Sequence, residues 1–206
     1  MQPRVVVVIP THNAVEWIMS AVDSAVEQTH QNLEVVVSDD GSSDGTTDLL
    51  ASKITVEHQH TIGDMRRVSG LYKGREISVL YRPNPMGPAY TRNEIIRFAW
   101  GHADWFAMLD ADDFWKPTRI ERMLEVIKGY PRPGVIGAVY TDYDILHTKS
   151  GLVVHEFKQP YDYAALLNDN IVHSGCMVTK FAFARCNLYD ETLRTCEDYD
   201  LWLRIG

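Results

Sequence analysis

The stretch RVVVVIPTHN, residues 4–13, decides the fold class of this 206-residue chain. Its apolar positions are continuous rather than alternating, and most carry β-branched side chains, which is typical of a strand buried on both faces of a parallel sheet. Residues 13–28 follow with apolar side chains at helical spacing, which predicts an amphipathic helix. Asn13, with Glu16 three residues later, fits the capping pattern of a helix start.

The alternation of strand and helix continues along the first half of the chain. Further strands are predicted at LEVVVS (33–38), ISVLYRPN (77–84) and DWFAML (104–109). The stretches TTDLLAS (46–52) and AYTRNEIIRFAW (89–100) are predicted as helices between them. This order predicts an α/β protein with an open, mostly parallel twisted sheet and helices on both faces.

Two regions depart from this pattern. Residues 53–76 have no clear period and are longer than most connections, so they are functional, mobile or contain a hairpin. In the second half, Pro117 is predicted to open a helix. The stretches VIGAVYTDYDIL (135–146) and LVVHEF (152–157) are then predicted to form a β-hairpin around the turn HTKSG.

The composition argues against several classes of function. The chain is 45% hydrophobic and 23% charged, its formal net charge is -8 and its pI is near 5.4. This acidic balance argues against a nucleic-acid-binding protein and against a polybasic membrane patch. The longest apolar run, Val5 to Ile9, is too short to cross a bilayer. The cysteines Cys176, Cys186 and Cys196 form no CxxC pair, which favours reduced thiols in a cytoplasmic protein.

Polar loops follow three of the predicted strands: PTHN (10–13), SDDGSSDGT (38–46) and LDADD (109–113). Ligands of open α/β sheets bind beyond the carboxyl ends of the strands, so we expect these loops to converge. The third loop contains three carboxylates within four positions, which repel one another. A hard divalent cation, Mn2+ or Mg2+, would compensate them through oxygen ligands. Turn or capping roles for these aspartates are the alternative.

Five stretches extend over nearly the whole chain, from about Arg4 to Ile205. They are VVVVIPTHN, EVVVSDDGSSDGT, NPMGPAYTRNEIIRFAWG, WFAMLDADDFWKPTRI and CEDYDLWLR. In this order and spacing they resemble the inverting nucleotide-sugar glycosyltransferases of family 2, which have the GT-A fold. The resemblance implies that the first two loops hold the nucleotide, that an Asp-x-Asp holds a divalent metal on the diphosphate, and that the late Glu-Asp pair supplies the catalytic base.

The resemblance also implies a single GT-A domain over residues 1–206. Residues 1–113 would be its nucleotide-binding half, and residues 114–206 its acceptor-side half with the β-hairpin. Relatives usually continue past the position of Gly206, so a truncation of the acceptor-side half is left open. The stretch TRN at 91–93 replaces the more usual ARN.

The expected nucleotide-binding residues come from four loops. They are Pro10, Thr11, Asn13, Asp40, Asn84, Gly87, Arg92 and Asp110. Asp40 looks like the carboxylate that accepts the base N3–H, which favours a uracil nucleotide, although an Asx-turn explains the same residue. For Asn13 the capping role is an equally good explanation. For Arg92 the alternative is a solvated arginine on the surface of a helix.

The expected metal ligands are Asp112, as the direct ligand, and Asp110, which is placed to reach the ribose or the metal. Asp113 is expected to order the turn. By the resemblance, Asp198 is the catalytic base and Glu197 holds the acceptor or the loop, although both could instead cap the last helix.

Two further residues are weak candidates for the donor or acceptor pocket. His173 fits a buried histidine with satisfied hydrogen bonds equally well. Trp202 fits a packing anchor, although an aromatic face can also stack on a sugar.

The predicted activity is metal-dependent, inverting transfer of a hexosyl or N-acetylhexosaminyl group. The donor would be a nucleoside-diphosphate sugar, with a UDP-sugar favoured. The acceptor would be a hydroxyl of a carbohydrate, as in a polysaccharide precursor. A catalytically silent nucleotide-sugar-binding domain and a phosphotransfer enzyme with an Asp-x-Asp remain alternatives, and the oligomeric state is left open.

Overall fold

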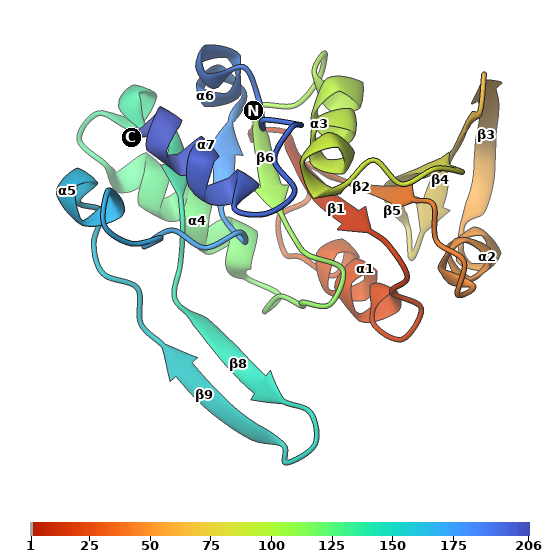
Figure 1. Cartoon of the computed structure of the whole chain (residues 1–206), viewed down its shortest axis with the longest axis horizontal. Helices are drawn as coiled ribbons and strands as arrows, with labels where there is room; N and C mark the ends of the chain where they lie inside the picture. Colours follow the sequence, from red (N-terminus) through yellow and green to blue (C-terminus); the bar gives the residue numbers. More distant parts are fainter. Residues whose placement is uncertain (1) are drawn as a thin grey trace.

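The structure is a computed structural model that describes residues 2–206. Within these residues an eight-stranded sheet has the order β3-β4-β5-β2-β1-β6-β10-β7 (Figure 1). Its strands are β1 (Val5–Thr11), β2 (Leu33–Asp40), β3 (Thr55–Ile62), β4 (Met65–Tyr72), β5 (Arg75–Arg82), β6 (Trp105–Met108), β7 (Ala138–Val139) and β10 (Met177–Thr179). A separate two-stranded sheet pairs β8 (Tyr143–His147) with β9 (Leu152–Glu156).

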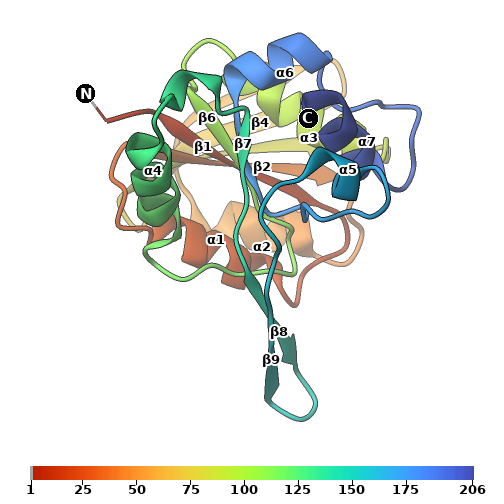
Figure 2. The same ribbon diagram turned by 90° about the vertical axis from the view of Figure 1, so that its left-hand side faces the viewer.

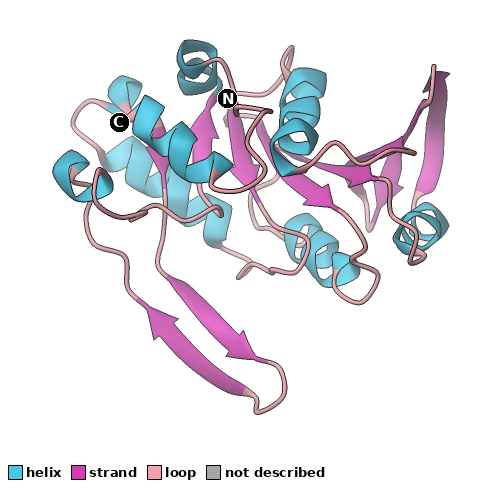
Figure 3. Ribbon diagram, in the orientation of Figure 1, coloured by secondary structure: helices cyan, strands magenta, loops and turns pink. Residues whose placement is uncertain are grey.

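The helices cover both faces of the large sheet (Figures 2 and 3). They are α1 (Ile18–Val26), α2 (Thr46–Lys53), α3 (Pro88–Ala99), α4 (Arg119–Gly129), α5 (Tyr163–Leu166), α6 (Lys180–Cys186) and α7 (Glu197–Ile205), with a 3-10 turn η1 (Pro133–Val135). None of the helices among the described residues has the length and apolar character needed to cross a lipid bilayer.

Strand β1 explains why helices cover both faces of the sheet. It pairs in parallel with β2 on one side and β6 on the other, and β2 pairs in parallel with β5. Val5, Val7 and Ile9 pack into one core with α1, α2 and α4. Val6 and Val8 pack into the other core with α3, α5, α6 and α7. A strand buried on both faces needs a continuous apolar run, so the expected α/β architecture is confirmed.

The first helix begins later than predicted. Helix α1 starts at Ile18, and the residue at its N-cap position is Trp17. Asn13 has a left-handed φ of 51°, so the predicted capping role is wrong. Its backbone N–H donates to Ser42 Oγ at 2.8 Å, and its side-chain oxygen accepts from the Ser43 N–H at 2.8 Å. The loop after β2, rather than helix geometry, therefore fixes the conformation of Asn13.

Residues 53–76 contain a hairpin, one of the alternatives predicted for them. Strands β3 and β4 pair antiparallel and extend the sheet beyond β5. Strand β3 is exposed along its whole length, whereas β4 contributes the buried Val68. A strand exposed on both faces has no alternating pattern, which is why the sequence showed no clear period.

In the second half, the predicted strand at 135–146 divides into two. Ala138 and Val139 form β7 at the edge of the large sheet, next to the antiparallel strand β10. The rest of the stretch forms β8, which with β9 projects from the body as a two-stranded ribbon (Figures 1 and 2). The predicted β-hairpin is therefore present.

Candidate active site

The loops after β1 and β2 meet, as the topology predicts. The ring Nδ1 of His12 lies 2.8 Å from the backbone oxygen of Asp40, and Asn13 is bound to Ser42 and Ser43. Between these loops, the hydroxyl of Thr11 is buried and has no hydrogen-bond partner within residues 2–206. A buried hydroxyl is normally satisfied, so Thr11 presents a free polar group at the carboxyl end of the central strand. Pro10, beside it, is partly buried.

Asp40 anchors the loop that leads into α3. Its two carboxylate oxygens accept from the N–H groups of Met86 and Gly87, each at 2.8 Å. A terminal nitrogen of Arg82 lies 3.2 Å from one of these oxygens. Gly87 has a φ of 96°, which L side chains rarely adopt. Asn84, in the same loop, is exposed. The structure thus gives Asp40 an anchoring role, and contact with a nucleotide base stays a prediction.

Arg92 is buried on α3, so a solvated helical arginine is excluded. One terminal nitrogen lies 2.6 Å from Asp110, and the other lies 2.5 Å from Glu197. Burial opposes the charge of the guanidinium, but the neighbouring Asp110 and Glu197 raise its pKa. These two ion pairs bring the acidic loop (residues 109–113) and the start of α7 together, although the two lie far apart in the sequence.

The three carboxylates of the acidic loop have different surroundings. Asp110 is held by Arg92 and by the hydroxyl of Ser174, which donates to its second oxygen at 2.8 Å. Asp112 is exposed and makes no hydrogen bond or ion pair within the described residues. The N–H of Asp113 donates to the backbone oxygen of Asp110 at 3.1 Å, so its backbone closes the turn, and a role of its carboxylate there stays a prediction.

The acidic loop fits a divalent cation through its charge. Although Asp113 is exposed as a residue, desolvation of its carboxyl raises its pKa to about 6, and the charges of Asp110 and Asp112 add to this effect. A cation would relieve this repulsion through oxygen ligands. Within residues 2–206 no group of three or more His, Cys, Asp or Glu side chains is arranged to hold a metal alone. Asp112 as a direct metal ligand stays a prediction.

Helix α7 begins with Glu197, which is buried, and Asp198, which is partly exposed. Neither residue caps the helix, because the N-cap position is taken by Cys196 in a left-handed conformation. The Asp198 carboxylate accepts from the N–H of Tyr199 at 2.8 Å and from the side-chain amide of Asn170 at 3.4 Å. Asp198 thus faces the loop before β10.

Sequence reasoning missed Asn170 and Ser174, which contact Asp198 and Asp110 respectively. Both flank His173 in the stretch NIVHSG, residues 170–175. Their only signal was that polar residues interrupt an apolar stretch there, which does not reveal the partner of a side chain.

His173 has the satisfied hydrogen bonds of a core histidine. Its Nδ1 accepts from the Gly175 N–H at 2.9 Å, and its Nε2 lies 3.1 Å from the backbone oxygen of Thr141, to which it donates. Burial lowers the pKa of His173 to about 4, and the charge of Arg119 adds to the shift. The imidazole is therefore neutral, its two hydrogen bonds fix its orientation, and a role in a sugar pocket stays a prediction.

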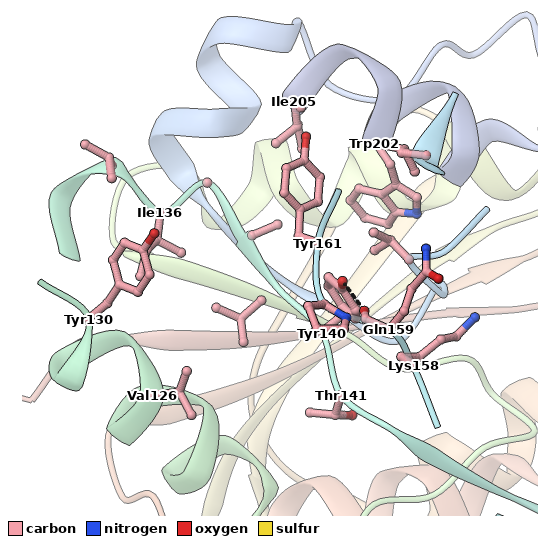
Figure 4. A pocket seen from close by; sticks show the side chains of 18 of the residues that line it. Val126, Tyr130, Ile136, Tyr140, Thr141, Lys158, Gln159, Tyr161, Trp202 and Ile205 are labelled. Atoms are coloured by element: carbon pink, nitrogen blue, oxygen red, sulfur yellow. Dashed lines mark hydrogen bonds between the residues drawn. The ribbon is translucent and has the colours of Figure 1, made fainter. Parts of the chain in front are cut away.

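Trp202 is buried on α7 and lines a cavity of about 770 Å³ at the β7 edge of the sheet. Figure 4 shows Trp202 and Tyr161 on one side of this cavity and Val126 and Tyr130 on the other. Neither Asp112 nor Asp198 lines it. Trp202 therefore packs in the core on the α3 side of the sheet, as the packing alternative holds, and contact with a sugar stays a prediction.

Comparison with other proteins agrees, along most of the chain, with the family that the sequence resembles. Residues 6–191 match the family model described as Glycosyl transferase family 2. An uncharacterized glycosyltransferase of Rickettsia typhi is 28% identical over 212 residues, covering 98% of this chain and 58% of that protein. The chondroitin synthase of Pasteurella multocida is 27% identical over 205 residues, covering 99% of this chain and 19% of that protein. The chain thus spans less than two thirds of these relatives.

Solved structures share the fold at low sequence identity. S. aureus TarS 1-349 superposes with a TM-score of 0.70 at 16% identity, over 98% of this chain and 55% of that chain. The mannosyltransferase PcManGT of Pyrobaculum calidifontis, in complex with GDP-Man and Mn2+, gives a TM-score of 0.66 at 21% identity, over 100% of this chain and 52% of that chain. The expected GT-A architecture is confirmed by this likeness.

Proposed function

The chain belongs to glycosyltransferase family 2, and from this premise we propose that it transfers a sugar from a nucleoside-diphosphate sugar to a carbohydrate hydroxyl with inversion. A single observation carries the proposal: Arg92 joins Asp110 of the acidic loop to Glu197, next to Asp198, through two ion pairs. The proposed diphosphate site and the proposed base would then be neighbours at the carboxyl end of the central strands.

The proposed donor is a UDP-sugar. Structural neighbours support a nucleotide-sugar site, because TarS has been solved with UDP and with UDP-GlcNAc, and PcManGT with GDP-Man. On this chain the unpartnered hydroxyl of Thr11 and the loops around Asn13 and Asp40 would receive the nucleoside. The choice of uracil over cytosine rests on Asp40 alone.

The proposed cofactor is Mn2+ or Mg2+, held by Asp112, with Asp110 close to the same diphosphate. When bound, the cation supplies electrostatic stabilisation of the departing nucleoside diphosphate. Asp110 itself is held by Arg92 and Ser174, so Asp112 is the carboxylate that can move toward a ligand without breaking an ion pair.

Asp198 would act as the general base. As the acceptor oxygen attacks the anomeric carbon, its proton passes to the Asp198 carboxylate, and the bond from that carbon to the diphosphate oxygen breaks. A single displacement of this kind inverts the anomeric configuration. Asn170 contacts one carboxylate oxygen of Asp198, and Glu197 supports the turn from within the protein.

The proposed acceptor is a growing glycan, and the transferred group is a hexosyl or N-acetylhexosaminyl group. The support is that relatives of similar identity include the chondroitin synthases of Pasteurella multocida and Escherichia coli and the hyaluronan synthase of Pasteurella multocida. Their names describe those proteins, which are several times longer than the part that this chain matches.

A donor screen tests the proposal. The chain is incubated with UDP-, GDP- and CDP-sugars and short glycan acceptors, with Mn2+ or with EDTA. We expect release of UDP that requires the metal, and NMR of the product should show an inverted anomeric centre. Binding of UDP without release from any donor would support the silent-domain alternative. Retained anomeric configuration would contradict the assigned mechanism.

A further inference from the structure

We infer that Arg92 is a positioning residue, which places the base Asp198 by holding Glu197 against Asp110. The inference rests on the proposed function, because it assigns a role within that site. It differs from the role expected from the sequence, in which Arg92 contacts the nucleotide. Arg92 comes from α3, whereas Asp110 follows β6 and Glu197 opens α7, so one side chain links three elements.

Both terminal nitrogens of the buried guanidinium are already paired with protein carboxylates. Only 6% of Arg92 is exposed, and its two terminal nitrogens bind two different partners at 2.6 and 2.5 Å. Its charge also lies 5.8 Å from the ring centre of Tyr189. A phosphate would compete with these carboxylates for the same two nitrogens, and displacing Glu197 would leave a buried charge without its partner, which is costly.

Glu197 depends on Arg92 for its position. It is 8% exposed, and Arg92 is its hydrogen-bond partner among the described residues. Asp198 follows directly in the chain, so a shift of Glu197 moves the carboxylate of Asp198 as well. The planar fork of arginine can hold two carboxylates at fixed angles, whereas the point charge of lysine cannot.

The neighbouring residue Asn93 reinforces this link. Its side-chain oxygen accepts from the N–H of Tyr189 at 3.0 Å, and its amide donates to the backbone oxygen of Tyr189 at 2.9 Å. Helix α3 therefore fixes the segment before α7 through Asn93 and the first residue of α7 through Arg92. On the other side, Ser174 holds the second oxygen of Asp110.

The variant Arg92→Lys tests the inference because it retains the charge and removes the fork. We expect the turnover at saturating donor to fall about a hundredfold, the scale of a misplacement of about 1 Å in an active site. We expect the affinity for UDP, measured by calorimetry, to stay within about threefold, because Arg92 does not bind the nucleotide. Arg97→Lys is the matched control, since Arg97 lies on the same helix and its pair with Glu191 is half-exposed. It should change neither quantity.

The opposite pattern overturns the inference. If Arg92→Lys weakens UDP binding at least tenfold and leaves turnover at saturation unchanged, Arg92 contacts the nucleotide. Glu197→Gln gives a second test that keeps the shape of the pair. Residues that act as a unit are not additive, so Arg92→Lys combined with Glu197→Gln should be no slower than the slower single variant. Full additivity would contradict the inference.

A readout without substrate separates this inference from the proposed function. The N–H of Asp200 donates to the backbone oxygen of Cys196 at 3.0 Å in the first turn of α7. Hydrogen exchange at this amide should be at least about tenfold faster in Arg92→Lys than in the wild type and in Arg97→Lys. Unchanged exchange would overturn the inference even if a donor is found. Faster exchange in a chain that turns over no donor would leave the positioning role standing and reject the proposed function.

Discussion

Single residues of the acidic loop make different contacts although they lie close together in the sequence. Asp110 is tied to Arg92 and Ser174, Asp113 closes a turn through its backbone N–H, and Asp112 is exposed without a partner among the described residues. Charge alone therefore does not identify a metal ligand. Pairing argues against Asp110 as the direct ligand, because a carboxylate already paired with a buried arginine is costly to release.

We expect Asp112→Ala to abolish the metal dependence of UDP binding. In the wild type, EDTA should weaken UDP affinity relative to Mn2+, whereas in the variant both titrations should give the same weak affinity in calorimetry. Asp64→Ala is the control, because Asp64 is exposed at the turn between β3 and β4. Equal UDP affinity of the wild type with EDTA and with Mn2+ would contradict the assignment.

We expect Asp198→Asn to keep the UDP affinity and to lower turnover by about a hundredfold or more, the usual effect of losing a general base. Asp200→Asn is the matched control on the same helix, since Asp200 pairs with Arg204 one turn later. Steady-state release of UDP measures both variants. Transfer by Asp198→Asn at the wild-type rate would show that another group takes the proton.

The sequence identified the carboxylates of the site but not their partners. The resemblance to the family implied a diphosphate site at Asp110 and Asp112 and a base at Glu197 and Asp198. The ion pairs of Arg92 could not be predicted, because they depend on where α3 and α7 pack across the sheet. The sequence pattern of one segment contains no information on the distance from that segment to another segment.

Among the connecting elements, the loop at 83–87 depends on Asp40. We expect Asp40→Asn to lower the free energy of unfolding by about 1–3 kcal/mol, because the amide leaves the N–H of Met86 or Gly87 without an acceptor. Urea unfolding measures this change. Asp48→Asn, at an exposed position of α2, should have little effect. If Asp40→Asn retains full stability but loses the preference for UDP over CDP, Asp40 reads the base instead.

Acidic pH should destabilise the fold through His173, which lies in the loop before β10. Its pKa in the folded state is about 4, below the ordinary value of 6.5, so between these values the unfolded chain binds a proton that the folded chain does not. The free energy of unfolding should therefore fall as the pH drops from about 6.5 to about 4. Above this window His173 contributes no pH dependence.

Urea unfolding of His173→Gln across the same pH range isolates this contribution. The variant should lose less stability than the wild type between the two pH values. His58→Gln, on the exposed strand β3, should retain the wild-type slope. Equal slopes for the wild type and His173→Gln would show that the folded histidine takes up its proton near the ordinary pH.

Elements were predictable where burial imposes a pattern. The central strands and α3 appear within a few residues of their predicted places, because their burial requires apolar runs. The start of α1 was misplaced, since the conformation of Asn13 is set by a loop distant in sequence. The three-residue strand β10 was not predicted as an antiparallel insertion between β6 and β7, because so short a segment has too few positions for a period.

In the whole molecule, the two edges of the large sheet come from different parts of the sequence. One end of the sheet is built by the β3–β4 hairpin from the first half of the chain, and the other by β7 and β10 from the second half. The middle strands hold the loops of the candidate site. This division agrees with the predicted nucleotide-binding and acceptor-side halves, whose separate roles stay a prediction.

The projecting β8–β9 ribbon has a consequence for how a protease would meet this protein. A lone pair of strands is marginally stable in water, and the turn between these strands contains Lys149. We expect limited trypsin digestion to cut after Lys149 first. The nicked chain should show two bands on a denaturing gel but elute as one species in gel filtration, because β10 lies between β6 and β7 and binds the late fragment to the early one. Separation of the two fragments would contradict this expectation.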